Sequence, residues 1–158
     1  MKSNLFLVIY LILAGLFLGS CTSDLVVNES AVVEGLWDKN DTVTFDFEIN
    51  DTLSNFDFFI NVRHKISYPY QNIFFFVNTE FPNGNLTNDT IECVLADVRG
   101  KWYGRGFGDV KENRILITKN LRFPVSGYYQ MKFVQAMREE KLSGLTDIGI
   151  QISKASAN

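Results

Sequence analysis

Apolar and polar side chains alternate along several short segments of the chain. Residues 43–49 are apolar at every second position, from Val43 to Ile49, and the same period of two recurs in residues 58–66, 129–133 and 148–152. Side chains two residues apart lie on one face of a β-strand, so each segment predicts a strand with one buried and one wet face.

One apolar segment has no alternation. Residues 73–77 read Ile-Phe-Phe-Phe-Val, which is typical of a strand covered on both sides. Turn-forming residues separate the apolar segments, as at Asn50-Asp51 and Pro82-Asn83-Gly84-Asn85. We therefore expect an all-β protein, an antiparallel two-sheet β-sandwich that is Ig-like or jelly-roll-like, with at most one short helix. Residues 134–142 are the segment that could form that helix, with charged residues 138–141 as its wet side.

The N-terminus has the layout of a bacterial lipoprotein signal. An apolar run over residues 5–18 follows Lys2 and ends in the small residues Gly19 and Ser20 before Cys21. A membrane-spanning helix needs about 20 apolar residues, whereas a signal-peptide core has about 7–15. We predict cleavage before Cys21 and lipidation of its thiol and amine, with palmitate-type acyl chains. An ordinary secretory signal and an anchor helix are the alternatives.

This signal sets the expected domain organisation and location. Residues 1–20 form the cleaved signal, 21–30 the lipidated N-terminus and a short tether, and 31–158 a single β-sandwich domain. Residues 25–27 are open to a second interpretation as an edge strand. Thr22 follows the lipidated cysteine where an aspartate would signal inner-membrane retention. We therefore expect anchoring in the cell envelope, at the outer membrane and facing the periplasm.

Composition excludes several classes of function. The chain has 158 residues and a formal net charge of -3, so no basic excess favours nucleic acid as a partner. With Cys21 lipidated, Cys93 has no disulfide partner and is expected to be a buried thiol. His64 is the sole histidine and lies on an apolar face, which excludes a multi-histidine metal site. No nucleophile elbow or phosphate-binding loop is present. We predict that the protein is not an enzyme and uses no metal or cofactor.

Two aromatic segments are candidate contact surfaces. The glycine-rich segment 100–109 contains an aromatic and basic cluster: Trp102, Tyr103, Arg105 and Phe107. Exposed aromatic residues with arginine are favoured at interface hot spots and suit sugar stacking. A second segment carries Tyr68 and Tyr70 on either side of a proline. The rings of the first segment could instead close the end of the sandwich. Each of the two tyrosines could instead be half-buried with its hydroxyl bonded to backbone, and for them we favour this structural role.

The chain also resembles a known family. The motifs that carry the resemblance are the Leu18-Gly19-Ser20-Cys21 lipobox, Trp37, Asn61-Val62-Arg63, Tyr68-Pro69-Tyr70-Gln71-Asn72, Leu95-Ala96-Asp97, Gly100-Lys101-Trp102-Tyr103-Gly104, Gly127-Tyr128-Tyr129, Gln135-Ala136-Met137-Arg138 and Leu142-Ser143-Gly144-Leu145-Thr146-Asp147-Ile148-Gly149. In order and spacing they resemble the gliding-motility lipoprotein GldH family of Bacteroidetes-type bacteria. The resemblance implies an envelope lipoprotein needed for gliding and tied to the type IX secretion machinery. It supplies no catalytic residue, and only the lipid attachment at Cys21 transfers.

Two hypotheses for function follow. The first is a structural or interaction component of the motility machinery, held at the membrane by its lipid and in contact with other gliding or secretion proteins of the envelope. The second is a carbohydrate-binding or glycan-processing accessory, because sandwiches with exposed aromatic rings often bind sugars. A glycosidase would need two carboxylates across a cleft, and Asp97 and Asp109 are the nearest candidates.

Three short motifs are candidates for modification. Thr42, Thr52 and Thr90 each follow an aspartate and precede an aliphatic residue. This pattern resembles the sites that such bacteria O-glycosylate in the periplasm. An Asp-Thr pair is also an ordinary junction between a turn and a strand, so both readings stay open.

Overall fold

The computed structural model describes residues 24–33 and 35–156, and within them it forms strands and no helix. The strands are β1 (Leu25–Val32), β2 (Leu36–Asp38), β3 (Val43–Ile49), β4 (Phe56–Lys65), β5 (Asn72–Glu80), β6 (Leu86–Val94), β7 (Val110–Leu121), β8 (Gly127–Gln135), β9 (Lys141–Ser143) and β10 (Leu145–Lys154). None of the described residues forms a helix long and apolar enough to cross a membrane.

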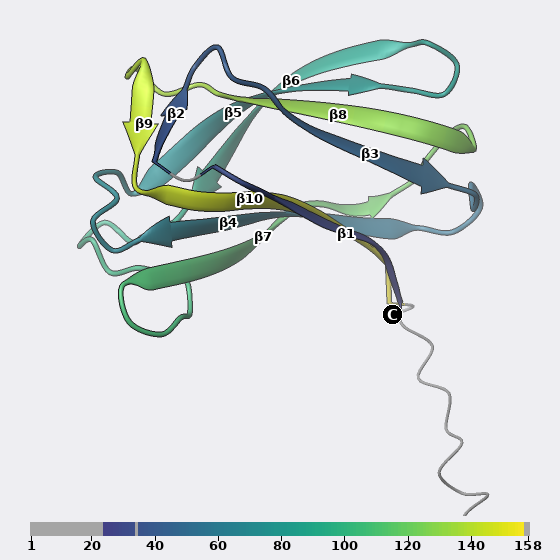
Figure 1. The fold of residues 1–158 in the computed structure, drawn as a ribbon. Helices are drawn as coiled ribbons and strands as arrows, with labels where there is room; N and C mark the ends of the chain where they lie inside the picture. Colours follow the sequence, from purple (N-terminus) through teal and green to yellow (C-terminus); the bar gives the residue numbers. More distant parts are fainter. Residues whose placement is uncertain (1–23, 34, 157–158) are drawn as a thin grey trace, which may run out of the picture.

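The strands form two stacked four-stranded sheets. One sheet has the order β1-β10-β4-β7 and the other the order β3-β8-β5-β6, and all pairings are antiparallel. The short β2–β9 pair closes one end between the sheets (Figure 1). The predicted antiparallel two-sheet β-sandwich is therefore confirmed.

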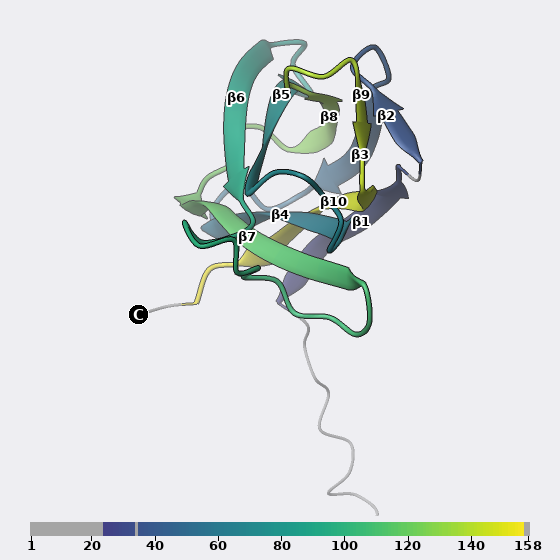
Figure 2. The same cartoon turned by 90° about the vertical axis from the view of Figure 1, so that its left-hand side faces the viewer.

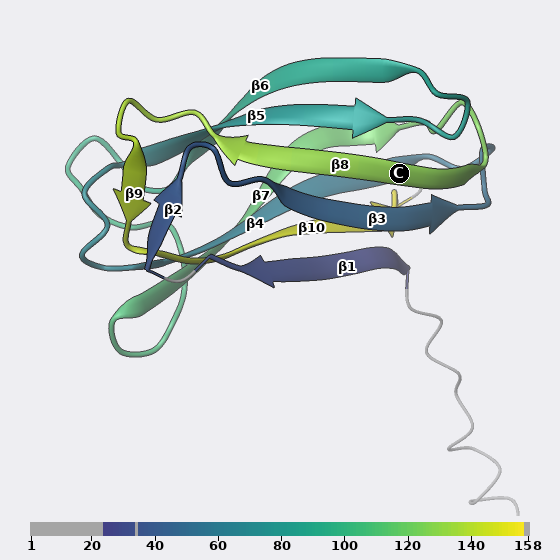
Figure 3. The ribbon, with the colours of Figure 1, turned by 45° about the horizontal axis from the view of Figure 1, so that its top comes forward.

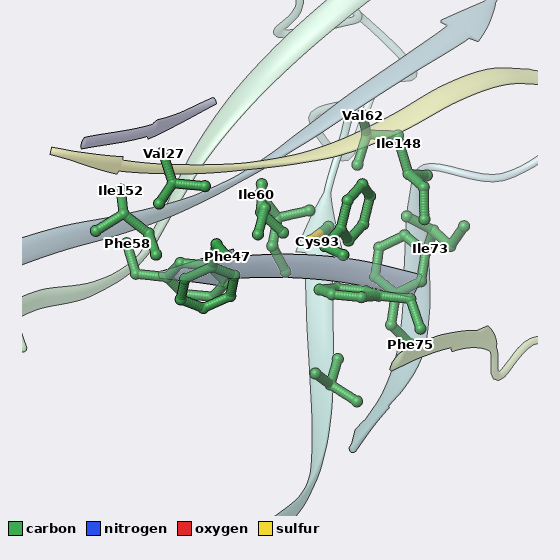
Figure 4. Packing of buried hydrophobic residues seen from close by; sticks show 14 of the residues in the cluster. Val27, Phe47, Phe58, Ile60, Val62, Ile73, Phe75, Cys93, Ile148 and Ile152 are labelled. Atoms are coloured by element: carbon green, nitrogen blue, oxygen red, sulfur yellow. The ribbon is translucent and has the colours of Figure 1, made fainter. Parts of the chain in front are cut away.

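The core lies between the facing sheets and follows the period of two. Phe58, Ile60, Val62 and His64 of β4 are all buried, and β3 and β5 contribute buried rings from the other sheet (Figure 4). Ile66 departs from the alternation that predicted it. It lies beyond the end of β4 and is 51% exposed, because the chain turns there toward β5.

The apolar sequence of β5 predicted a strand covered on both sides, and this prediction is wrong. Ile73, Phe75 and Val77 are buried, but Phe76 on the outer face is 57% exposed. Among the described residues no third layer of strands or helices covers this face. Beside Phe76, the backbone N–H of Phe74 donates to the Met137 sulfur at 3.4 Å. The inward residues of β5 therefore belong to the core between the sheets, and Phe76 leaves an exposed apolar side chain on the outer face.

Residues 134–142 do not form the helix that the sequence allowed. Strand β8 continues to Gln135, a turn follows, and β9 begins at Lys141. The Gln135 side chain holds this turn, since its amide donates to the Glu139 carbonyl at 2.9 Å and its carbonyl oxygen accepts from the Met137 N–H at 2.9 Å. Leu142 then pairs with Trp37 in the small sheet.

The first strand begins inside the segment expected to be the tether. β1 pairs with β10 from Leu25 onward, so residues 25–27 form the edge strand that was the open alternative. The lipobox and Cys21 lie outside the described residues. Every strand of both sheets follows Cys21, so the chain after this cysteine contains all the elements that build the core.

The sandwich has two different ends. At one end, here called the tether end, the Lys154 N–H donates to the Asp24 carbonyl, and Lys154, Phe56 and Leu121 pair across the sheet. At the opposite end, the distal end, lie the loops 66–71 and 95–109 and the turn 136–140 (Figure 3). A strand rises about 3.3 Å per residue, so the ten residues of β4 separate the two ends by about 30 Å.

Truncating a core side chain of β4 tests this packing. We expect Ile60→Ala to lower the free energy of unfolding by about 2–5 kcal/mol, because Ile60 is fully buried between the sheets. Ile66→Ala, six residues along the chain at an exposed position, should change it by less than about 0.5 kcal/mol. Urea unfolding of both variants measures the two changes. Equal losses would contradict the assignment of Ile60 to the core.

Candidate functional site: the distal end of the sandwich

A row of aromatic rings crosses the distal end. The ring centroids of Tyr70 and Tyr68 are 5.8 Å apart, those of Tyr68 and His64 5.7 Å, and those of His64 and Trp102 4.4 Å. The four rings come from β4, from the loop after it and from the loop between β6 and β7. Their contacts fasten the two predicted aromatic segments to each other and to the core.

Tyr68 is part of the core rather than of the surface. Its side chain is 3% exposed, and its hydroxyl donates to the Asn72 carbonyl at 3.0 Å. Burial raises the pKa of the Tyr68 phenol well above its ordinary value. Gly144 approaches the Tyr68 backbone so closely, at a φ of +86°, that a Cβ there would lie 3.0 Å from the Tyr68 Cα. The structural role that we favoured fits this position, and Tyr68 is no candidate for direct contact with a partner.

Tyr70 is half-buried and links two loops. Its hydroxyl donates to the Glu139 carboxylate, which joins the β4–β5 loop to the β8–β9 turn. This hydrogen bond raises the pKa of the Tyr70 phenol, because the neutral hydroxyl is the form that donates. Part of the ring remains accessible to a partner.

His64 is the member of the aromatic row that lies deepest, since its side chain is fully buried. Its Nδ1 lies 2.9 Å from the Lys65 carbonyl, and desolvation lowers the pKa of the imidazole, which favours the neutral ring with a proton on Nδ1. Its Nε2 has no hydrogen-bond partner among the described residues. Within these residues no cluster of histidine, cysteine and carboxylate side chains could hold a metal ion. His64 is thus a core residue, as its place on an apolar face predicted.

The loop between β6 and β7 is anchored near its middle, at Trp102 and Arg105, and is exposed on either side of these residues. We call residues 97–109 the distal loop. Trp102 is half-buried against His64 and pairs with Ala96. Arg105 pairs through its backbone with Glu112 of β7. Trp102 therefore anchors the loop, and its ring is not free to act as an exposed platform.

The distal loop presents three large apolar side chains to solvent. Phe107 is 99% exposed, Val98 94% and Tyr103 63%. The Asp97 carboxylate accepts hydrogen bonds from the N–H groups of residues 99 and 101, both at 2.9 Å, and so holds Val98 at the tip of a tight turn. Single exposed apolar residues are common on protein surfaces, but three on one loop form a candidate contact surface.

The same loop carries a small excess of positive charge, since three basic residues stand against the carboxylates of Asp97 and Asp109. Arg99, Lys101 and Arg105 are exposed, and none of them forms an ion pair with another described residue. The whole chain is acidic, with a formal net charge of -3, so this basic cluster stands out against its surroundings. Exposed cations beside exposed apolar groups suit a partner that offers an apolar pocket with an acidic rim.

The structure sorts the remaining predicted residues by accessibility. Thr42 and Thr90 are exposed and line one shallow hollow on the outer face of the β3-β8-β5-β6 sheet, together with Phe76. Thr52 is half-buried in the turn before β4. Cys93 is fully buried, and burial raises the pKa of its thiol to about 12, so it stays protonated and inert as expected.

Sequence reasoning found the distal loop and named Tyr103 and Arg105, which are exposed. It also named Trp102, which is anchored against His64, and did not single out Val98. Amino-acid type alone does not separate an aromatic plug from an aromatic platform. The Asp97-Val98-Arg99 sequence did hold a usable signal, because an aspartate that caps a tight turn leaves the next side chain pointing outward.

Comparisons with known proteins agree with these observations. The profile of the family described as GldH lipoprotein matches residues 25–152. The gliding motility lipoprotein GldH homolog of Christiangramia forsetii is 35% identical over 143 residues, which cover 86% of this chain and 88% of that protein. The gliding motility lipoprotein GldH of Flavobacterium johnsoniae is 34% identical over 151 residues, which cover 91% of this chain and 94% of that protein.

Likeness to solved structures is remote. An uncharacterized protein of Listeria monocytogenes matches 84% of this chain with a TM-score of 0.43 and 16% sequence identity, and the match covers 11% of that protein. A likeness at this level says nothing about function. The profile match and the two relatives, each about one third identical over most of both chains, show that this chain belongs to the GldH lipoprotein family.

Proposed function

We propose that the protein supports gliding motility as a lipid-anchored interaction module whose distal loop binds a neighbouring envelope protein. The observation that carries the proposal is the distal loop itself, with Phe107, Val98 and Tyr103 exposed beside basic residues that have no described ion-pair partner. Large apolar side chains and arginine are the residue types that dominate binding energy in protein interfaces.

The position of the loop supports the same role. The described chain begins at Asp24, three residues after Cys21, and three residues extend at most about 10 Å. A lipid on Cys21 would hold the tether end close to the membrane, while the distal loop lies about 30 Å away at the other end of β4. Tethering raises the effective concentration of the loop for a neighbour, so a small surface is sufficient.

The partner that fits this surface is another protein of the motility and type IX secretion machinery, with an acidic rim around an apolar pocket. We place the anchor in the outer membrane with the domain facing the periplasm, because Thr22 follows the lipidated cysteine. A non-enzymatic role is part of the proposal. The sole histidine is buried, and the Cys93 thiol, with a pKa raised to about 12, is a poor nucleophile.

The carbohydrate-binding alternative loses two of its candidate rings. Tyr68 is buried, and Trp102 packs against His64. Tyr103 stays exposed and Tyr70 half-buried, but without Tyr68 and Trp102 the four rings form no exposed platform, which favours the interaction module.

The mass of the mature protein tests the anchor. We expect the intact mass of the chain purified from envelopes to equal a polypeptide that begins at Cys21 plus acyl groups, with an added sugar mass if exposed Thr42 or Thr90 is glycosylated. Metabolic labelling with an alkyne palmitate should mark the native chain and Cys93→Ala, but not Cys21→Ala. Label that persists in Cys21→Ala would exclude Cys21 as the attachment site.

Substitutions on the two ends of the sandwich test the partner surface. We expect Phe107→Ser combined with Tyr103→Ser to weaken partner binding about thirtyfold or more, because losing interface hot spots costs about 2 kcal/mol or more. The matched control is Leu53→Ser, which removes an 84% exposed apolar side chain at the tether end. Crosslinked co-purification from cells, quantified by mass spectrometry, measures partner recovery in each strain.

Thermal melts should show unchanged stability in all of these variants, since the substituted side chains are exposed. Full recovery of partners with the loop variant would contradict the proposal. Equal loss with Leu53→Ser would contradict it as well, because the effect would then not belong to the distal loop.

A further inference from the structure

A cleft opens between the two sheets at the tether end. Its volume is about 500 Å³, which lies within the range of sites that bind small molecules. Strand β6 forms one side of the opening and the end of β7 the other, and these are the edge strands of their sheets on the same side of the molecule (Figure 2).

The inward side chains of β6 show why the sheets separate here. Cys93 is fully buried, Ile91 is half-buried, and Asp89 and Thr87 are exposed although they face the cleft. The sheets are therefore packed together at the Cys93 end of β6 and diverge toward its start. Polar and charged residues at inward positions of an edge strand keep this part of the sandwich open.

The interior of the cleft is apolar and its rim is polar. Its deepest residues are buried or nearly buried and come from both sheets: Phe47, Phe58, Val77, Tyr129 and Ile152. Its walls are half-buried apolar side chains: Phe81, Ile91, Ile117, Leu121 and Met131. Thr79 is the one buried polar side chain of the lining, and the exposed polar groups lie at the opening: Thr87, Asp89, Thr90, Thr118 and Arg122. Such a cleft favours an elongated apolar ligand with a polar head.

The cleft lies where acyl chains are within reach. Leu121 lines it at the β7 edge, and a paired row through Phe56 and Lys154 crosses the sheet to Asp24 beside the opposite edge strand, β1. Three strand spacings make this distance about 14 Å, which an acyl chain can span. Cys21 precedes Asp24 by three residues, a reach of at most about 10 Å. The membrane-proximal end of a lipoprotein domain therefore carries an apolar cleft, which would otherwise expose apolar surface to water.

We propose that this cleft binds one acyl chain, with the hydrocarbon between the sheets and an anionic head group at Arg122. The Arg122 Nε donates to the Asn55 side-chain oxygen at 3.1 Å, which fixes the guanidinium at the opening. A guanidinium binds carboxylate and phosphate head groups best. This site is separate from the distal loop, so the acyl-chain proposal can be tested independently of the proposed partner binding.

Isoleucine methyl NMR on the chain from residue 22 onward tests the proposal with laurate as the probe, kept below its micelle-forming concentration. Ile91, Ile117 and Ile152 line the cleft, whereas Ile73 and Ile148 are buried elsewhere in the core. We expect saturable shifts of the first three methyl signals and none of the other two. No shifts, or equal shifts of all five, would overturn the proposal.

Two substitutions on neighbouring residues of β6 supply a matched pair. Thr87 faces the cleft and Asn88 lies on the outer side of the strand, and both are exposed. Thr87→Trp should block the opening and weaken laurate binding at least tenfold, while Asn88→Trp should leave it unchanged. Arg122→Gln should weaken binding of laurate but not of uncharged decanol. Unaltered affinity in Thr87→Trp would place the ligand outside the cleft.

The source of the acyl chain is distinguished with the lipidated protein in phospholipid nanodiscs. If the bilayer or the Cys21 lipid supplies the chain, the cleft isoleucines will show the ligand-bound shifts before any laurate is added. If the ligand is a free fatty acid, these shifts will appear only on addition. A spectrum that stays ligand-free in both conditions would overturn the proposal.

Discussion

The structure depends on burying two apolar sheet faces against each other. Aromatic rings pack between the sheets near the tether end, where Phe47 and Tyr129 stack with centroids 5.7 Å apart and Phe123 packs edge-on against both. At the distal end the space is closed differently, by Trp37 and Leu142 of the small sheet and by the row that runs from Trp102 to Tyr70. The two ends of the sandwich acquire different properties from this one packing requirement.

Much of this fold follows from local patterns, and the exceptions have physical reasons. The period of two predicted β3, β4, β8 and β10, because each strand buries one face and carries mostly polar residues on the other. The exposure of Phe76 was not predicted, because the sequence of a single strand does not show how many layers cover its sheet. The turn after Gln135 depends on side-chain hydrogen bonds, which helical periodicity does not register. The cleft arises from the divergence of two sheets, which no single segment records.

The candidate surfaces divide in the same way. Residue types identified the distal loop, but only packing shows that Trp102 anchors it and that Phe107 and Val98 are exposed. The family assignment explains why such a domain is anchored, and the geometry suggests how the anchor is used. In the orientation that we propose, the tether end with its apolar cleft lies toward the lipid, and the distal end presents cations and apolar side chains to a neighbour. Membership of the GldH family and this division of the two ends together favour a supporting role in the motility machinery.

The orientation of the domain on a membrane tests this account most directly. A donor dye would be attached at Leu53→Cys, at the tether end, or at Val98→Cys, on the distal loop, in the lipidated protein on nanodiscs that contain an acceptor-labelled lipid. Buried Cys93, with its raised thiol pKa, should not react with the dye. The account predicts much stronger energy transfer from position 53 than from position 98, because β4 separates the two ends by about 30 Å. Equal transfer from both positions, or stronger transfer from position 98, would contradict it.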